Sequence, residues 1–358
     1  MKRWAGVGAL AVLMTLGACD EDTPTEVDDG FDFTEIIEAY VDQTVVATYA
    51  DLETQATALR AAVAAFDGDQ SQANLDAAAN AWIASREPWE ASEGFLFGPV
   101  AFLGLDPSLD SWPLDQAQLD DVLASSFDLS PDFIREGLNA TLRGFHTVEF
   151  LLFRDGQPRT AGDVTDRERE YLVAATEVLF EDATLLQEAW TSAVDGVGPR
   201  AFADEFRNAG QAGSRYLSQT EAILELIEGM IVIADEVGNG KINDPFTEQD
   251  PAIVESWFSW NSLTDFANNV RSIQNAYLGG YHKGTRGTGL NSYVAGEDPA
   301  LDTRIQAEIQ AALDAVGDVP EPFRSNLDAN AEINAAIAAL NTLVATFEND
   351  LKALVRGD

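Results

Sequence analysis

The feature that most constrains the fold is an uninterrupted stretch, residues 34–66, that contains neither glycine nor proline. Its apolar side chains recur at the spacing of one helix face: Ile36, Ile37, Tyr40, Val41, Val45, Tyr49 and Leu52. Such a face must pack against other elements, and a spacing of about 3.6 residues is typical of an α-helix. The chain contains no strand-length run of alternating β-branched residues. The sequence therefore predicts an all-α fold built from helical bundles.

The chain is long enough for two domains, each with its own core. Further helical patterns are separated by segments rich in Gly, Pro and Asp, and residues 98–131 are expected to form a long irregular connection. The break "DGVGPR" ends at residue 200. We therefore expect an N-terminal helical bundle over 34–200 and a C-terminal helical bundle over 201–358, with a cleft between or beside them.

The chain is strongly acidic, with 61 Asp and Glu against 21 Lys and Arg and a formal net charge of -40. A phosphate backbone needs Lys and Arg to neutralise it, so this charge argues against nucleic acid as a partner. An acidic surface instead attracts cations. Solubility in a salty habitat is the alternative explanation for the acidic excess.

The N-terminus, "MKRWAGVGALAVLMTLGAC", has a basic start followed by an apolar run that is short for a membrane span. Its end, "LGAC", resembles a bacterial lipobox. We expect residues 1–18 to be a lipoprotein signal peptide and Cys19 to carry the lipid anchor. Residues 19–33 read as an acidic tether, which predicts a location in the bacterial cell envelope, facing the periplasm or the surface. An ordinary secretory signal with an incidental cysteine is the alternative.

Three helical segments that are otherwise apolar carry polar side chains at helical spacing. They are Arg86, Glu90 and Glu93 in the first, His146 and Glu149 in the second, and Ser262, Asp265 and Asn269 in the third. Buried charges are costly unless they are paired or bound to metal. We therefore expect these three polar faces to meet in the fold.

The spacing of His146 and Glu149 allows a helix to present one nitrogen and one carboxylate oxygen to the same ion. Glu90, Glu93 or Asp265 could complete a mixed nitrogen and oxygen shell, which suits iron, zinc or manganese. The alternative is a core histidine bonded to a glutamate that fixes its tautomer.

A peptidase function is a separate hypothesis. The chain has no H-E-x-x-H and no G-x-S-x-G motif. His146 and Glu149 together with the distant His282 imitate the ligand set of zinc carboxypeptidases. Those enzymes use an α/β sheet, however, and His282 lies in the glycine-rich segment 279–296. We therefore favour a protein that is not an enzyme.

Several segments resemble the imelysin family, including its insulin-cleaving-protease-like and iron-regulated members. They are "WIASREPWEASEGFLFGP", "GFHTVEFLLF", "DEVGNGKINDPF" and "ESWFSWNSLTDFANNVRSIQNAYLGGY". Gly144, His146 and Glu149 match the G-x-H-x-x-E motif of that family, and the resemblance covers essentially the whole mature chain. It implies two helical bundles, a cleft near this motif, an envelope location and a role in iron acquisition. It also implies a metal site at the His-x-x-Glu pair.

We therefore expect a lipid-anchored envelope protein that binds a metal ion, iron or alternatively zinc, for uptake with a transporter that the sequence does not identify. The expected metal ligands are His146, Glu149, Glu90 and Glu93. The expected further cleft residues are Gly144, Arg86, Ser262, Asp265 and Asn269. A zinc metallopeptidase remains one alternative. A non-catalytic module that binds a protein, a glycan or a chelated metal is the other.

Overall fold

A computed structural model describes residues 30–358. The predicted signal peptide, Cys19 and most of the predicted tether lie outside the described residues. Within 30–358 the chain is helical, and its strands are limited to the short antiparallel pair β1 (Phe153–Arg154) and β2 (Gln157–Pro158). The all-α prediction is confirmed. No helix in this range combines the length and the apolar character needed to cross a membrane.

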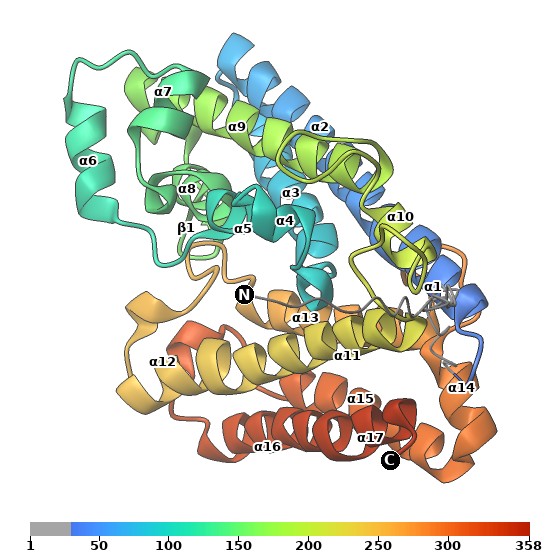
Figure 1. Ribbon diagram of the computed structural model, residues 1–358. Coiled ribbons are helices and arrows are strands. Elements are labelled where there is room, and N and C mark those ends of the chain that lie inside the picture. Colours follow the sequence, from blue (N-terminus) through green and yellow to red (C-terminus); the bar gives the residue numbers. More distant parts are fainter. Residues whose placement is uncertain (1–29) are drawn as a thin grey trace, which may run out of the picture.

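The helices from the first half of the chain pack together in the upper part of Figure 1. The main ones are α2 (Val46–Gly68), α3 (Gln72–Glu90), α8 (Gly144–Leu152) and α9 (Asp166–Thr191). The helix predicted over 34–66 is present as α1 (Thr34–Ala39), the π-helical turn η1 (Tyr40–Val45) and α2. Its apolar stripe is buried, as the spacing requires.

The helices from the second half lie below them in Figure 1. The main ones are α11 (Gln219–Asp235), α13 (Ser262–Leu278), α15 (Pro299–Gly317) and α16 (Asn330–Thr346). A π-helical segment, η5 (Glu236–Ile242), directly continues α11. Shorter α-helices in both halves of the chain include α7 (Pro131–Gly137), α10 (Ala203–Arg207), α12 (Asn243–Glu248), α14 (Leu290–Glu297) and α17 (Lys352–Arg356).

The two groups of helices contact each other where α3 ends. Helix α13 packs against α3, and α11 packs against the short turn η2 (Glu93–Phe95). At Gly229 a side chain would meet the carbonyl oxygen of Gly94 at 2.1 Å, so the approach of α11 to η2 depends on glycine. This contact places the end of α3 between both groups. The domain boundary near residue 200 stays a prediction.

The segment 98–131 is only partly the irregular connection that its composition predicts, so that prediction is wrong in part. It contains α4 (Pro99–Phe102), α5 (Leu105–Asp110) and α6 (Gln116–Ala124). Glycines with positive φ immediately precede the first two of these helices, and a proline occupies the first turn of α4, so both residue types start helices here. Helix α5 packs against α8 and α9, which fixes its last residue, Asp110, in the interior.

Candidate functional site

Gly144 sets the position of α8. Its backbone has φ +77°, and a side chain there would lie 2.2 Å from the carbonyl oxygen of Leu109. Both observations require glycine, since only glycine adopts this conformation freely and leaves room for the neighbouring backbone. The close approach joins the start of α8 to the end of α5. Because Asp110 ends α5 and His146 lies in the first turn of α8, the glycine brings these two side chains together.

His146 is fully buried, and its ring makes an edge-to-face contact with Trp112. Its Nε2 atom lies 3.0 Å from Oδ1 of Asp110 and 3.7 Å from Oε1 of Glu255. The contact with Asp110 is a close ion pair, although Nε2 makes no hydrogen bond of good geometry with any of the residues that the structure describes. Asp110, His146 and Glu255 each offer one donor atom within 4.8 Å of the others, and we call them the histidine group.

Glu149 lies on the other side of the imidazole. Its Oε2 atom is 3.1 Å from Nδ1 of His146. Its Oε1 atom accepts hydrogen bonds from the backbone N–H and the hydroxyl of Ser259, at 2.8 Å and 2.7 Å. Glu149 therefore orients the ring through Nδ1 and leaves Nε2 directed at Asp110 and Glu255. A carboxylate behind a metal-binding histidine has the same effect.

Arg86, on α3, is a buried cation among the acids Glu90, Asp110, Glu255 and Asp265, and we call these residues, with His146, Glu93 and Lys241, the cluster. Its guanidinium lies 2.5 Å from Asp110, 3.1 Å from Glu255 and 3.3 Å from Asp265. It also pairs with Glu90 one turn further along the helix. All these side chains are nearly or completely buried, so Arg86 compensates charges that water does not reach.

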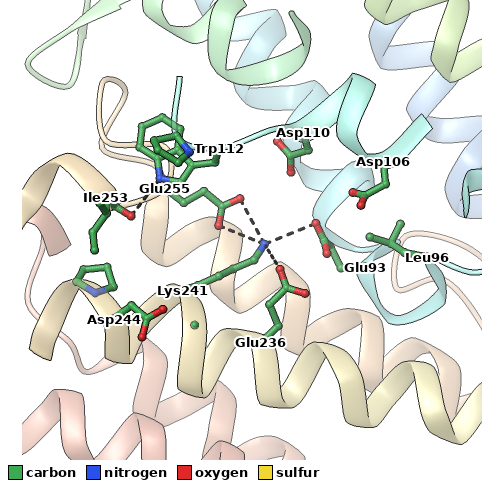
Figure 2. A pocket seen from close by; sticks show the side chains of 13 residues that line it. Glu93, Leu96, Asp106, Asp110, Trp112, Glu236, Lys241, Asp244, Ile253 and Glu255 are labelled. Atoms are coloured by element: carbon green, nitrogen blue, oxygen red, sulfur yellow. Dashed lines mark hydrogen bonds and ion pairs between the residues drawn. The ribbon is translucent and has the colours of Figure 1, made fainter. Parts of the chain in front are cut away.

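Lys241, in η5, is a second internal cation. Its Nζ atom lies 3.2 Å from Glu255, 3.6 Å from Glu93, 3.8 Å from Glu90 and 4.0 Å from Glu236. Figure 2 shows the lysine pointing between carboxylates that come from both groups of helices. Its side chain keeps 11% exposure, whereas Arg86 has none.

A second set of possible ligands adjoins the first. Glu90, Glu93 and Asp110 also place one donor atom each within 4.8 Å of one another, and we call them the glutamate group. Asp110 belongs to both groups. A cavity of about 380 Å³ opens onto the cluster, and its lining includes Glu93, Asp110, Trp112, Lys241 and Glu255.

The polar face predicted on α13 also reaches the cluster. Asp265 contacts the buried guanidinium. Asn269 donates a hydrogen bond to Oε2 of Glu90 at 2.5 Å. The Ser262 hydroxyl donates to the backbone carbonyl of Glu255 at 2.5 Å. The three polar helix faces therefore meet, and α13 supplies Asn269 and Ser262 as hydrogen-bond donors to Glu90 and Glu255.

The acids of the cluster are of two kinds, those with a lowered pKa and those with a raised pKa. Burial by itself raises the pKa of Asp110 and Glu255, but the surrounding cations outweigh it and hold that of Asp110 well below its usual range and that of Glu255 at about 2. Burial lowers the pKa of His146, but Asp110 and its other acidic neighbours raise it well above its ordinary value. Burial dominates at Glu90 and Glu93 and raises the pKa of both well above the usual range.

His282 lies apart from these groups. It is partly buried, with Nε2 3.0 Å from Glu87 and Nδ1 3.3 Å from the side-chain nitrogen of Asn275. In the part of the chain that the structure describes, it belongs to neither set of possible ligands. It therefore does not supply the third ligand that the carboxypeptidase comparison needs.

Sequence reasoning missed three members of the cluster: Asp110, Lys241 and Glu255. Asp110 lies in the segment expected to be irregular, and Glu255 lies in a turn-rich piece before α13. Lys241 follows two glycines in a π-helical segment. None of them shares a helical period with another polar residue of the cluster, so no local spacing distinguishes them.

The fold and the site define a class: helical proteins that enclose a histidine and a cluster of carboxylates between two groups of helices. The profile of the family described as Imelysin matches residues 45–349. The chain belongs to the imelysin family.

Relatives of known name cover nearly the whole chain. It is 29% identical over 350 residues to iron-regulated protein A of Synechococcus elongatus, a match that covers 98% of this chain and 92% of that protein. Its fold is similar to the crystal structure of a candidate iron-regulated protein A precursor from Parabacteroides distasonis, with a TM-score of 0.82 and 34% identity over 92% of this chain and 95% of that one. An imelysin-like protein from Psychrobacter arcticum shares the fold alone, with a TM-score of 0.71 and 13% identity over 89% and 94% of the two chains.

Proposed function

We propose that this chain is a lipid-anchored envelope protein of the imelysin type that binds a metal ion as cargo for uptake, with iron as the physiological ion. The histidine group is the proposed site. One observation carries the proposal: the fully buried Nε2 of His146 faces Asp110 at 3.0 Å and Glu255 at 3.7 Å, and the three residues place one donor atom each within 4.8 Å of the others. Buried charged groups this close together need a proton or a cation between them.

The donor set fits a first-row transition metal. One imidazole nitrogen with two carboxylate oxygens suits iron, zinc or manganese better than Cu(I). Glu149 supports the ring from behind, which is the arrangement that holds a ligand histidine in place. The cavity gives a route from solvent to Asp110 and Glu255. Binding exchanges the proton on His146 for the metal ion, because a ligand imidazole must be neutral.

The choice of iron as the ion and the location in the envelope are supported by separate observations. Two relatives are named as iron-regulated proteins. The lipobox-like sequence before Cys19 supports anchoring to a membrane. The net charge of -40 supports a surface that concentrates cations, although salt confines the effect to about 8 Å.

A metal titration tests this proposal. The full chain, solubilised in mild detergent, is titrated calorimetrically with Fe²⁺ under anaerobic conditions, and with Mn²⁺ and Zn²⁺. The variant is His146→Gln, and the matched control is His282→Gln, which replaces the other histidine of the chain outside the cluster. Circular dichroism checks that all three proteins are folded.

We expect the His146 variant to lose at least about 100-fold in affinity and the His282 variant to bind like the wild type. Absence of binding to the wild type, or equal affinity in the His146 variant, overturns the proposal. The zinc peptidase alternative predicts the opposite for His282, whose replacement would then abolish zinc binding. Binding of a glycan or peptide that survives chelation would favour the non-catalytic module.

A further inference from the structure

The acid cluster offers two adjacent places for a cation, and they share one ligand. The histidine group and the glutamate group both contain Asp110. The proposed function uses only the histidine group. Two members of the glutamate group, Glu90 and Glu93, together with Glu255 and Glu236, surround the ammonium of Lys241 instead.

The contacts of this ammonium are unusual for a lysine salt bridge. Four carboxylates surround it, but among the described residues it hydrogen-bonds only to Glu255, at 3.3 Å. The distances to Glu93, Glu90 and Glu236 are 3.6, 3.8 and 4.0 Å, which are too long for hydrogen bonds. Oε2 of Glu255 is buried without a hydrogen bond, although it lies 3.2 Å from this ammonium. The ammonium is thus held as a point charge near the middle of the carboxylates.

We propose that the ammonium of Lys241 occupies the cation position of the glutamate group and thereby limits the cluster to one bound metal ion. A lysine suits this role because it is a compact charge on a flexible stem, whereas the planar guanidinium of Arg86 makes several fixed contacts. The inference rests on the proposed metal site, since it concerns how many cations that site accepts.

The position of Lys241 in the fold supports this role. It lies in the π-helical segment η5, one residue after Gly240, and both line the cavity through which a cation would arrive. Isolated π-helical turns often occur at functional sites, because the extra residue redirects a side chain. Here the turn aims Lys241 at Glu93 of η2 (Figure 2) and places it 3.8 Å from Glu90 of α3.

The test counts bound metal in the full chain with Lys241→Met. Mn²⁺ alone is the probe. The metal content of the protein is measured after desalting, and magnetic coupling between bound Mn²⁺ ions is measured by electron paramagnetic resonance. Lys283→Met is the matched control, because Lys283 also pairs with two acids but lies outside the cluster, at 39% exposure. Glu93→Gln added to Lys241→Met removes one ligand of the glutamate group.

We expect one Mn²⁺ per chain in the wild type and in the Lys283 variant, and two in the Lys241 variant. The two ions share Asp110, so their signal should broaden by magnetic coupling, and the second ion should be lost again when Glu93 is also replaced. Equal metal content in the Lys241 variant and the wild type overturns the inference, as do two ions in the wild type.

Stability provides a second measurement if the Lys241 variant folds poorly. Removal of the ammonium leaves its carboxylates without compensation, so added Mn²⁺ should raise the melting temperature of this variant more than that of the wild type. Lys241→Gln gives the same comparison with a polar side chain. The inference is overturned if Mn²⁺ raises the melting temperature of neither variant more than that of the wild type. The proposed function fails separately, when the wild type binds no metal or His146→Gln leaves its binding unchanged.

Discussion

Replacement of Arg86 by methionine is expected to destabilise the protein by about 3–5 kcal/mol at pH 8, because it leaves buried carboxylates without their cation. The structure places Asp110 at 2.5 Å, Glu255 at 3.1 Å and Asp265 at 3.3 Å from the guanidinium, all at most 7% exposed. Methionine keeps an apolar stem of similar length, so packing changes little.

The expected change in melting temperature follows from the size of the protein. Unfolding of the 329 described residues carries an entropy of roughly 0.7 kcal/mol/K, at about 2.1 cal/mol/K per residue. A loss of about 3–5 kcal/mol therefore lowers the melting temperature by roughly 4–7 °C. Thermal melts followed by circular dichroism at pH 8 and pH 5 measure it.

The destabilisation should be smaller at pH 5. The pKa of Asp265 is raised to about 6 by burial even while Arg86 lowers it, and without Arg86 it rises further. A carboxyl group whose folded pKa exceeds its unfolded value destabilises the fold while it is ionised. That cost falls by about 1.4 kcal/mol per pH unit as the pH drops from the folded pKa toward the unfolded value near 4.

The control is Arg60→Met, which removes a surface ion pair with Glu177 and a cation–π contact with Phe180; the Arg60 side chain is 46% exposed. It should change the free energy of unfolding by less than about 1 kcal/mol at both pH values. Equal losses at pH 5 and pH 8 for Arg86→Met would refute the electrostatic argument and assign the effect to packing. A loss below about 1 kcal/mol at pH 8 would refute the argument as a whole.

Three further predictions concern the helix that carries the histidine. Gly144→Ala should cost at least about 2 kcal/mol in urea denaturation, because of the positive φ and the 2.2 Å approach to Leu109; a cost near zero would contradict this account. Ser259→Ala removes one of two donors to Glu149 and should weaken metal binding about tenfold by calorimetry, whereas unchanged affinity would mean that the hydroxyl does not help to orient the ring. Mn²⁺ affinity should rise about tenfold per pH unit between pH 5 and 7, because binding displaces the proton of His146, whose pKa is raised; the same titration on His146→Gln should lack this slope.

The parts of the site that the sequence predicts are those whose spacing is local. Arg86 and Glu90 lie one helical turn apart, as do His146 and Glu149, and such pairs show in the sequence because helix geometry alone brings them together. The same reasoning predicts the polar face of α13. The cost of burying charge predicts that the three polar faces meet, and the contacts of Asp265 and Asn269 agree with this prediction.

The other members of the site depend on tertiary contacts. Asp110 becomes a neighbour of His146 only because Gly144 lets two backbones approach closely. Lys241 reaches the cluster because a π-helical turn redirects it, and this turn has no periodic signal. Glu255 precedes α13 by several residues and lies outside any helix. A sequence pattern cannot encode these distances, since each depends on how separate elements pack.

Stability alone does not account for the cluster. The chain has 21 basic residues to balance 61 acidic ones, yet Arg86 and Lys241 lie inside it and not on its acidic surface. Buried ion pairs add little net stability, and apolar side chains of the same volume often replace them without loss. A purely structural interior would therefore be expected to be mainly apolar here, and elsewhere in the described fold buried charges such as Asp182, Glu205 and Lys352 do not gather in one cluster of this size. The imidazole nitrogen of His146 between two carboxylates and the long contacts of the Lys241 ammonium are instead the features expected where protons and internal cations hold places that a metal ion can take.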